Sequence, residues 1–148
     1  MDTLPRNLWH NALMAHPASV PVVSDPPFAY DWRAVEKGIP TSALDEFAAY
    51  SSIPLKDLLE VVIPPRTLKH RRQRQETLNV DESDRFARVA RVYELAVKVY
   101  GNHDDGRLWL LNPKDRFEGR SPLSILRSEA GQMAVEEYLY QIDEGVFA

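Results

Sequence analysis

The stretch Trp109–Ala148 reads WLLNPKDRFEGRSPLSILRSEAGQMAVEEYLYQIDEGVFA and carries the clearest structural signals of the chain. Its opening apolar run ends at Asn112-Pro113, because the residue before a proline disfavours the helical conformation. A loop then extends through Gly119. The pair Ser121-Pro122 predicts the start of a helix, with serine at the N-cap and proline in the first turn.

A longer helix is predicted to begin near Ser128, with Glu129 in the first turn, where the helix dipole favours a negative charge. Its apolar residues recur at helical spacing and form one stripe: Val135, Tyr138, Leu139 and Ile142. Gly145 predicts its end. The apolar tail Val146–Ala148 then either docks on the protein's own core or inserts into a partner's pocket, because exposed apolar side chains gain nothing from solvent.

The longest helix is predicted from Asp81 or Ser83 to Tyr100, with Gly101 ending it. Its apolar residues follow the helical period: Phe86, Val89, Ala90, Tyr93, Ala96, Val97 and Tyr100. Three arginines off this stripe are expected to face solvent or a partner: Arg85, Arg88 and Arg91. Asp104-Asp105 opens the next helix. Its Trp109, like Tyr93, is expected to anchor the core, because large aromatic side chains dominate core energetics.

The first part of the chain is rich in proline up to residue 29, and proline disfavours regular helix. This arm is interpreted either as a flexible, loosely docked segment or as a short partner-binding segment. Four helices are predicted after it, starting at Asp31, at Thr41 or Ser42, at Pro54 and at Pro65. The last two are joined by a tight turn at Ile63-Pro64, which indicates a helix-turn-helix.

This motif departs from its usual pattern in two places. A small residue is usual in its first helix and a glycine at its turn, but this chain has Leu58 and Val62 there. Because valine is costly at positive φ, Pro64 and Pro65 are expected to supply the turn geometry instead.

The helix that starts at Pro65 reads PRTLKHRRQRQ and is strongly basic. Its candidate DNA-binding residues are Arg66, Thr67, Lys69, His70, Arg71, Arg72 and Arg74. Basic side chains clamp phosphates, and guanidinium groups also read guanine edges, so clustering them gives a salt-dependent affinity for DNA. The same composition equally suits a solvated basic helix, or one whose arginines pair with acidic residues of a partner.

The net charge of −4 conceals an uneven distribution, because residues 66–100 carry nine basic and five acidic side chains. The middle of the chain is therefore the part that suits a polyanion. The chain has no cysteine, which excludes disulfides and thiolate sites and fits a cytoplasmic protein. No apolar run approaches the ~20 residues that a membrane span requires.

No residue pattern indicates catalysis. The four histidines have no His or Cys partner one helical turn away, so no metal site is expected. No Gly-rich phosphate loop is present either, and no cofactor is expected. The neighbouring acids Glu136-Glu137 and Asp143-Glu144 point apart on a helix and indicate a solvated face. We therefore expect a binding protein and not an enzyme.

Four segments resemble the toxin-binding domain of the Xre/MbcA/ParS antitoxins: ESDRFARVARVYELAVKVYG, WLLNP, GRSPLSIL and the ending IDEGVFA. The resemblance extends from about Gly38 to Ala148. It is strongest to Xre antitoxins that are paired with a RES-domain toxin. Each segment alone is a weak signal, but their order, with the last at the end of the chain, is specific.

The resemblance implies an antitoxin that blocks the active site of a NAD-degrading RES-domain toxin and represses its own operon, acting as a homodimer within a larger complex. The implied organisation is all-α: an arm over 1–29, a helix-turn-helix over 30–80 and a toxin-binding domain over 81–148. The expected toxin contacts are Tyr138, Ile142, Gly145, Val146, Phe147 and Ala148. The alternatives are a stand-alone helix-turn-helix regulator without a toxin, and a partitioning or scaffold protein.

Overall fold

The computed structural model describes residues 26–145, so most of the arm and the tail Val146–Ala148 lie outside the described residues. Within this range the architecture is all-α, as expected, and contains seven α-helices and two short 3₁₀ helices. The elements are α2 (Trp32–Lys37), α3 (Ser42–Ser51), α4 (Leu55–Val62), α5 (Pro65–Gln73), α6 (Val80–Tyr100), α7 (His103–Leu111), η1 (Asp115–Phe117), η2 (Leu123–Ile125) and α8 (Glu129–Glu144).

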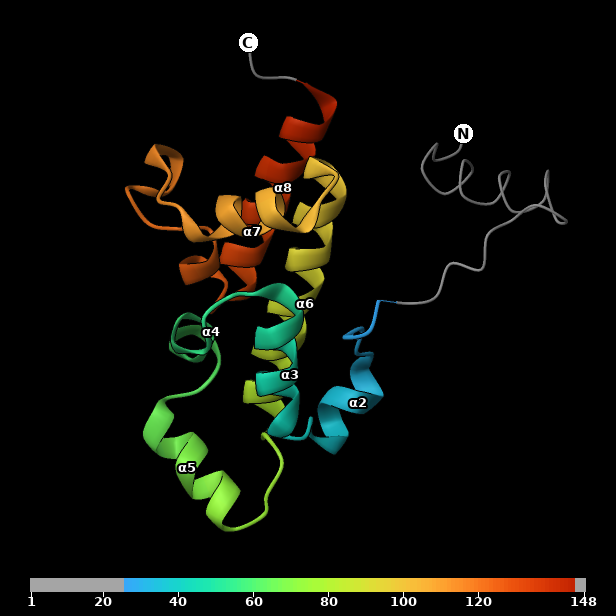
Figure 1. The fold of residues 1–148 in the computed structure, drawn as a ribbon, viewed down its shortest axis with the longest axis vertical. Helices are drawn as coiled ribbons and strands as arrows, with labels where there is room; N and C mark the ends of the chain where they lie inside the picture. The colour runs from blue at the N-terminus through green and yellow to red at the C-terminus, as the bar shows by residue number, and fades with distance from the viewer. Residues whose placement is uncertain (1–25, 146–148) are drawn as a thin grey trace, which may run out of the picture.

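The long helix α6 is the axis of the molecule (Figure 1). Helices α2, α3 and α4 pack around its first half, and α7 and α8 pack along its second half. Asn79 caps α6 and forms a capping box with Glu82, so the helix begins at Val80, slightly before the expected Asp81 or Ser83. Gly101 ends the helix in the left-handed conformation at φ 83°, as expected. A single rigid element thus connects the two parts of the chain.

The core is built on the apolar stripe of α6. Phe47 of α3 lies edge-on to both Phe86 and Tyr93, with ring centroids 5.6 Å apart in each pair. Trp109 is also buried, which confirms that it and Tyr93 are core residues. Phe28, at the end of the expected arm, packs against Phe47 with centroids 5.3 Å apart. The described end of the arm is therefore docked on the core.

Two expectations about the second half of the chain are wrong. Arg88 is not on an outer face: it is 8% exposed and donates hydrogen bonds to the Leu126 carbonyl, Gln132 and Asp84. Its burial is possible because these acceptors satisfy the guanidinium. Ser121-Pro122 starts a single 3₁₀ turn, η2, and not an α-helix, since the chain turns again before α8.

The tight turn between α4 and α5 is built by prolines, as expected. Val62 keeps helical geometry as the last residue of α4, and Ile63 is extended at φ −161°. Pro64 follows at φ −60° and ψ 141°, and Pro65 opens α5. The turn therefore needs no residue at positive φ, which explains why glycine is dispensable here.

Candidate DNA-binding and partner-binding surfaces

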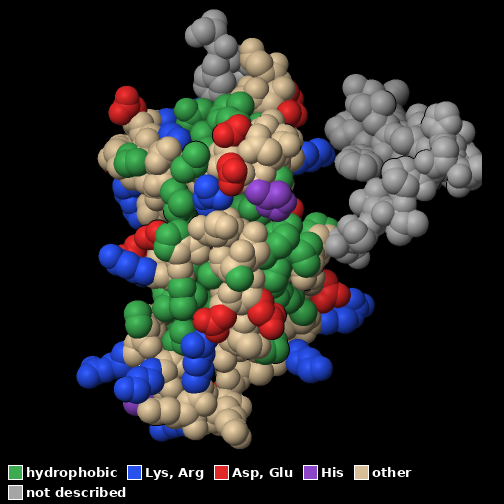
Figure 2. Space-filling view, in the orientation of Figure 1, with side chains coloured by type: hydrophobic (Ala, Val, Ile, Leu, Met, Phe, Trp, Pro, Cys, Tyr) green, Lys and Arg blue, Asp and Glu red, His purple; other side chains and the backbone are tan. Residues whose placement is uncertain are grey.

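Helix α5 lies at one end of the molecule, away from the body of α6 (Figure 1). Five exposed residues recur at i, i+3, i+4, i+7 and i+8, the last of them at the C-cap: Arg66, Lys69, His70, Gln73 and Arg74. We call these five residues the α5 face. Lys and Arg side chains gather at this end of the molecule (Figure 2). The helix thus presents a polar, basic surface of the kind that contacts DNA phosphates.

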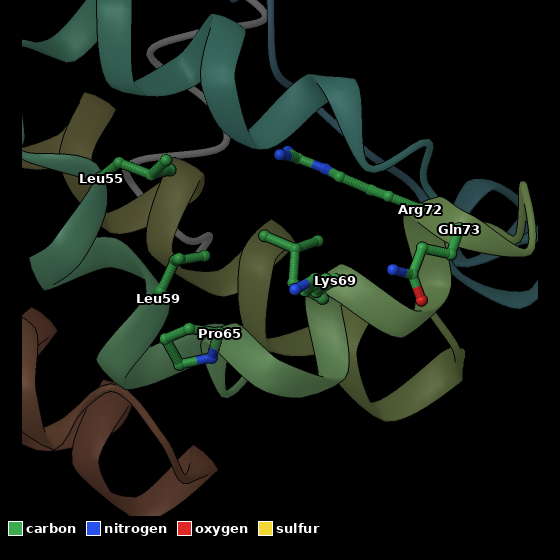
Figure 3. A pocket seen from close by; sticks show the side chains of 7 residues that line it. Leu55, Leu59, Pro65, Lys69, Arg72 and Gln73 are labelled. Atoms are coloured by element: carbon green, nitrogen blue, oxygen red, sulfur yellow. The ribbon is translucent and has the colours of Figure 1, made fainter.

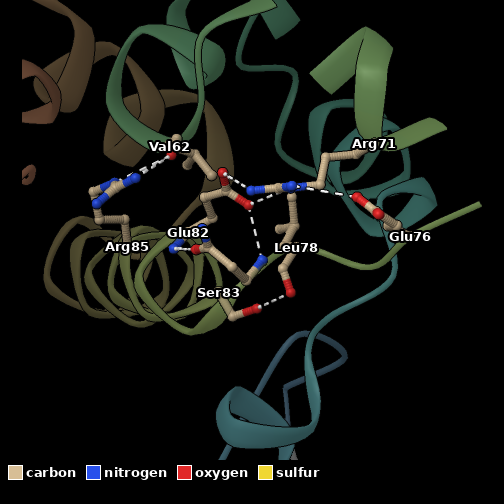
Figure 4. A network of polar contacts seen from close by, with 8 residues as sticks. Val62, Arg71, Glu76, Leu78, Glu82, Ser83 and Arg85 are labelled. Atoms are coloured by element: carbon tan, nitrogen blue, oxygen red, sulfur yellow. Dashed lines mark hydrogen bonds and ion pairs between the residues drawn. The ribbon is translucent and has the colours of Figure 1, made fainter. Parts of the chain in front are cut away.

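The opposite side of α5 carries one buried side chain, Leu68, and it is flanked by two arginines. Arg71 forms a two-pronged ion pair with Glu82 of α6, at 3.1 Å from Nε and 3.0 Å from Nη2. Its third nitrogen lies 3.3 Å from Glu76 (Figure 4). The hydrogen bonds that Arg71 donates to the Glu82 carboxylate raise the pKa of Arg71 above its usual value. Arg71 is therefore engaged within the protein.

Arg72 reaches in the other direction, to α3. Its guanidinium pairs with Asp45 and also donates to the Thr41 carbonyl. Figure 3 shows this side chain extended along a groove between α4 and α5. The groove is lined by Leu55, Leu59, Pro65, Leu68, Lys69, Arg72 and Gln73. Of the seven candidate DNA contacts, Arg66, Lys69, His70 and Arg74 thus point outward, and Thr67 is half-buried.

The candidate toxin contacts on α8 lie mostly on its inner side. Tyr138 is edge-on to Trp109 and to Phe117, with ring centroids 5.4 and 5.6 Å apart. Ile142 packs against the core and is partly exposed. Gly145 ends α8 in the left-handed conformation, as expected, and the three tail residues lie outside the described part of the chain. The structure therefore gives Tyr138 and Ile142 a packing role as well.

An unexpected surface lies on the outer side of α8. Met133 is 63% exposed and Tyr140 is 53% exposed, although both are large apolar side chains. They are seven residues apart on one face, together with the exposed Glu137 and Glu144. We call these four residues the α8 face. Exposed apolar side chains rimmed by charge are typical of protein contacts. The spacing was present in the sequence, but only the fold shows which stripe faces outward.

Two other kinds of site have no support in the described range 26–145. No group of three or more histidine, aspartate and glutamate residues is placed to hold a metal ion. None of the described helices has a segment that is both long and apolar enough to cross a membrane.

Comparisons with known proteins match two consecutive regions of the chain to known domains. Residues 33–91 match the family model of the antitoxin Xre-like helix-turn-helix domain. Residues 95–145 match that of the antitoxin Xre/MbcA/ParS C-terminal toxin-binding domain. The α5 face lies in the first match and the α8 face in the second. The boundary between the two matches falls within α6.

Three relatives are similar over different spans. An antitoxin Xre of Yersinia enterocolitica is 31% identical over 118 residues, covering 78% of this chain and 79% of that protein. An antitoxin Xre of Pseudomonas putida is 45% identical over 84 residues, which is 57% of this chain and about half, 53%, of that protein. A Sphingobium protein named Prs ADP-ribosylating antitoxin is 27% identical over 143 residues, 83% of this chain and 90% of that protein.

Proposed function

Because this chain belongs to the Xre antitoxin family, with a helix-turn-helix domain followed by a toxin-binding domain, we propose that it neutralises a RES-domain toxin that degrades NAD. The relatives from Yersinia enterocolitica and Pseudomonas putida are both named antitoxin Xre, which supports a binding protein and not an enzyme. The choice of a RES-domain toxin is supported by the segments WLLNP, GRSPLSIL and IDEGVFA, which resemble antitoxins of that kind.

The α8 face is the observation that carries the toxin-binding proposal. It lies inside the region matched to the toxin-binding domain, and it combines two exposed apolar side chains with two carboxylates. Such a face fits a toxin surface that offers an apolar depression with basic residues around it. The tail Val146–Ala148 follows directly from α8, and we propose that it enters the toxin's active site while the α8 face holds the toxin.

A titration of purified RES-domain toxin, with NAD loss as the readout, tests this proposal. The variant Met133→Glu with Tyr140→Glu should need a much higher concentration to inhibit, because each glutamate replaces apolar contact with a desolvated charge. Trp32→Glu is the matched control, since Trp32 is also 63% exposed but lies on α2. Inhibition by the double variant equal to that of wild type would remove the α8 face from the interface.

We propose further that the α5 face binds operator DNA and represses the chain's own operon. The observation in support is that its basic side chains Arg66, Lys69 and Arg74 are exposed, with no ion pair between them and any described carboxylate. A stand-alone regulator without a toxin would share this surface. Co-purification with a co-expressed RES-domain toxin separates the two functions, since only the antitoxin retains the toxin.

The DNA proposal is tested with the upstream region of the chain's own gene as the duplex. Lys69→Gln should weaken binding and lower the dependence of log affinity on log salt by about one phosphate contact. Lys98→Gln is the control, because it removes the same charge from an exposed lysine near the other end of α6. Equal salt slopes for the two variants would show that binding reflects overall charge and not the α5 face.

A further inference from the structure

The attachment of α5 to the rest of the protein is unusually polar. One side chain of the helix, Leu68, is buried, and within the described residues the other fixed side-chain contacts of α5 are made by Arg71 and Arg72. A helix that buries so little apolar surface gains little orientation from the hydrophobic effect. The direction in which the α5 face points therefore depends on these two arginines.

The two arginine contacts are unequal. The side chains of Arg71 and Glu82 are 24% and 6% exposed, and both guanidinium prongs reach the same carboxylate. The side chains of Arg72 and Asp45 are 40% and 49% exposed. Exposed pairs are screened by water and contribute little, whereas a buried, two-pronged pair fixes geometry and leaves an uncompensated charge when one partner is removed. The Arg71–Glu82 pair is thus the dominant brace.

Glu82 is itself held in place by the first turn of α6. Its Oε1 accepts a hydrogen bond of 2.8 Å from the backbone N–H of Asn79, and its own backbone N–H donates to the Asn79 side chain at 2.8 Å. Arg71 binds the same carboxylate that closes this capping box (Figure 4). The Arg71–Glu82 pair therefore fixes the orientation of α5 relative to the first turn of α6.

From this arrangement we infer that Glu82 is a positioning residue for DNA binding: its buried carboxylate, through Arg71, fixes the α5 face in the orientation that meets DNA. The inference rests on the proposed DNA-binding function. It assigns Arg71 a role inside the protein, in place of the direct DNA contact expected from the sequence. A negative charge near a DNA-binding surface should ordinarily weaken DNA binding. In our inference the negative charge of Glu82 is instead required for DNA binding. Whether removing this charge weakens or strengthens DNA binding therefore decides between a positioning role and simple repulsion.

The decisive variant is Glu82→Gln. Glutamine can still close a capping box, so the substitution removes the charge that braces Arg71 while keeping the acceptor for Asn79. Affinity for the upstream duplex should fall by roughly tenfold. Asp81→Asn is the matched control, because Asp81 is exposed in the same helical turn and loses the same charge. It should leave affinity unchanged or slightly raise it. Tighter binding by both variants would overturn the inference.

A second variant leaves the capping box untouched. Arg71→Lys keeps the positive charge but loses the planar fork that matches a carboxylate. It should lose affinity as Glu82→Gln does, and the double variant should lose no more than either one, because both substitutions break one brace. A lysine at 71 that binds DNA as well as arginine, or additive losses in the double variant, would instead make Arg71 a direct phosphate contact and refute the inference.

Hydrogen exchange of the protein without DNA separates this inference from the proposed function. In Glu82→Gln the amides of residues 65–73 should exchange faster, while those of residues 129–144 and the binding of toxin stay unchanged. If exchange is faster in Glu82→Gln but the wild-type protein binds no DNA, the DNA-binding function is refuted. The role of Glu82 in DNA affinity is then refuted with it. Unchanged exchange together with unchanged affinity would refute the brace itself.

Discussion

The α5 face and the α8 face are held in place by different forces. Helix α5 buries Leu68 alone and is braced by charged pairs at its sides. Helix α8 buries Val135 and Leu139, and its Tyr138 stacks edge-on against Trp109. The position of α5 therefore depends on ion pairs with a defined geometry, whereas the position of α8 depends on apolar surface removed from water.

The faces themselves differ in the same way. The α5 face is basic and polar, so its binding should be governed by counterion release and should weaken steeply with salt. The α8 face combines Met133 and Tyr140 with two carboxylates, so its binding should depend more on apolar burial and less on salt. The comparison teaches that the two faces of one chain should respond to different solution conditions, although α5 and α8 both contact the same long helix α6.

The strongest way to break this comparison is Trp109→Ala, which removes the aromatic support under α8. Truncating a buried tryptophan costs about 3–5 kcal/mol of unfolding free energy. Thermal denaturation should show earlier and less cooperative melting, with toxin binding lost as the fold is lost. A variant with unchanged melting that no longer binds toxin would place Trp109 in the interface and not in the core.

A smaller effect is expected from Arg88→Met, which keeps the aliphatic stem but removes the hydrogen bond to the Leu126 carbonyl at 3.1 Å. Leaving that carbonyl without its donor should cost about 1–3 kcal/mol. Toxin binding should weaken more than DNA binding, because Arg88 also joins α6 to Gln132 of α8.

The control for this prediction is Arg91→Met on the same helix, since Arg91 is exposed. Chemical denaturation of both variants measures the difference. Equal unfolding free energies would mean that water replaces the guanidinium beside Leu126.

The smallest effect on stability is expected from deleting Val146–Ala148, because Gly145 already ends α8 and the buried residues of that helix remain. The loss should stay below about 1 kcal/mol, as for other changes outside a core. Inhibition of NAD loss should nevertheless fall, while the complex still forms through the α8 face. Full inhibition by the truncated protein would show that the tail does not block the toxin.

Local signals in the sequence determined most of the helices. Asp31 caps α2 through its side chain, Ser128 caps α8, and Gly101 and Gly145 end their helices in the left-handed conformation. Each of these signals acts within about one turn, where the unsatisfied backbone groups of a helix end find a partner, so position in the sequence suffices to recognise it.

The roles of individual charged side chains were decided only by the tertiary structure. Arg71, Arg74 and Arg88 are all arginines on basic stretches, yet one braces α5, one faces solvent and one is buried beneath α8. Their fate depends on acceptors far along the chain, such as Glu82 for Arg71 and the Leu126 carbonyl for Arg88. The partners in these pairs come from different elements and meet only in the folded protein. The spacing of residues within a single helix therefore cannot predict them.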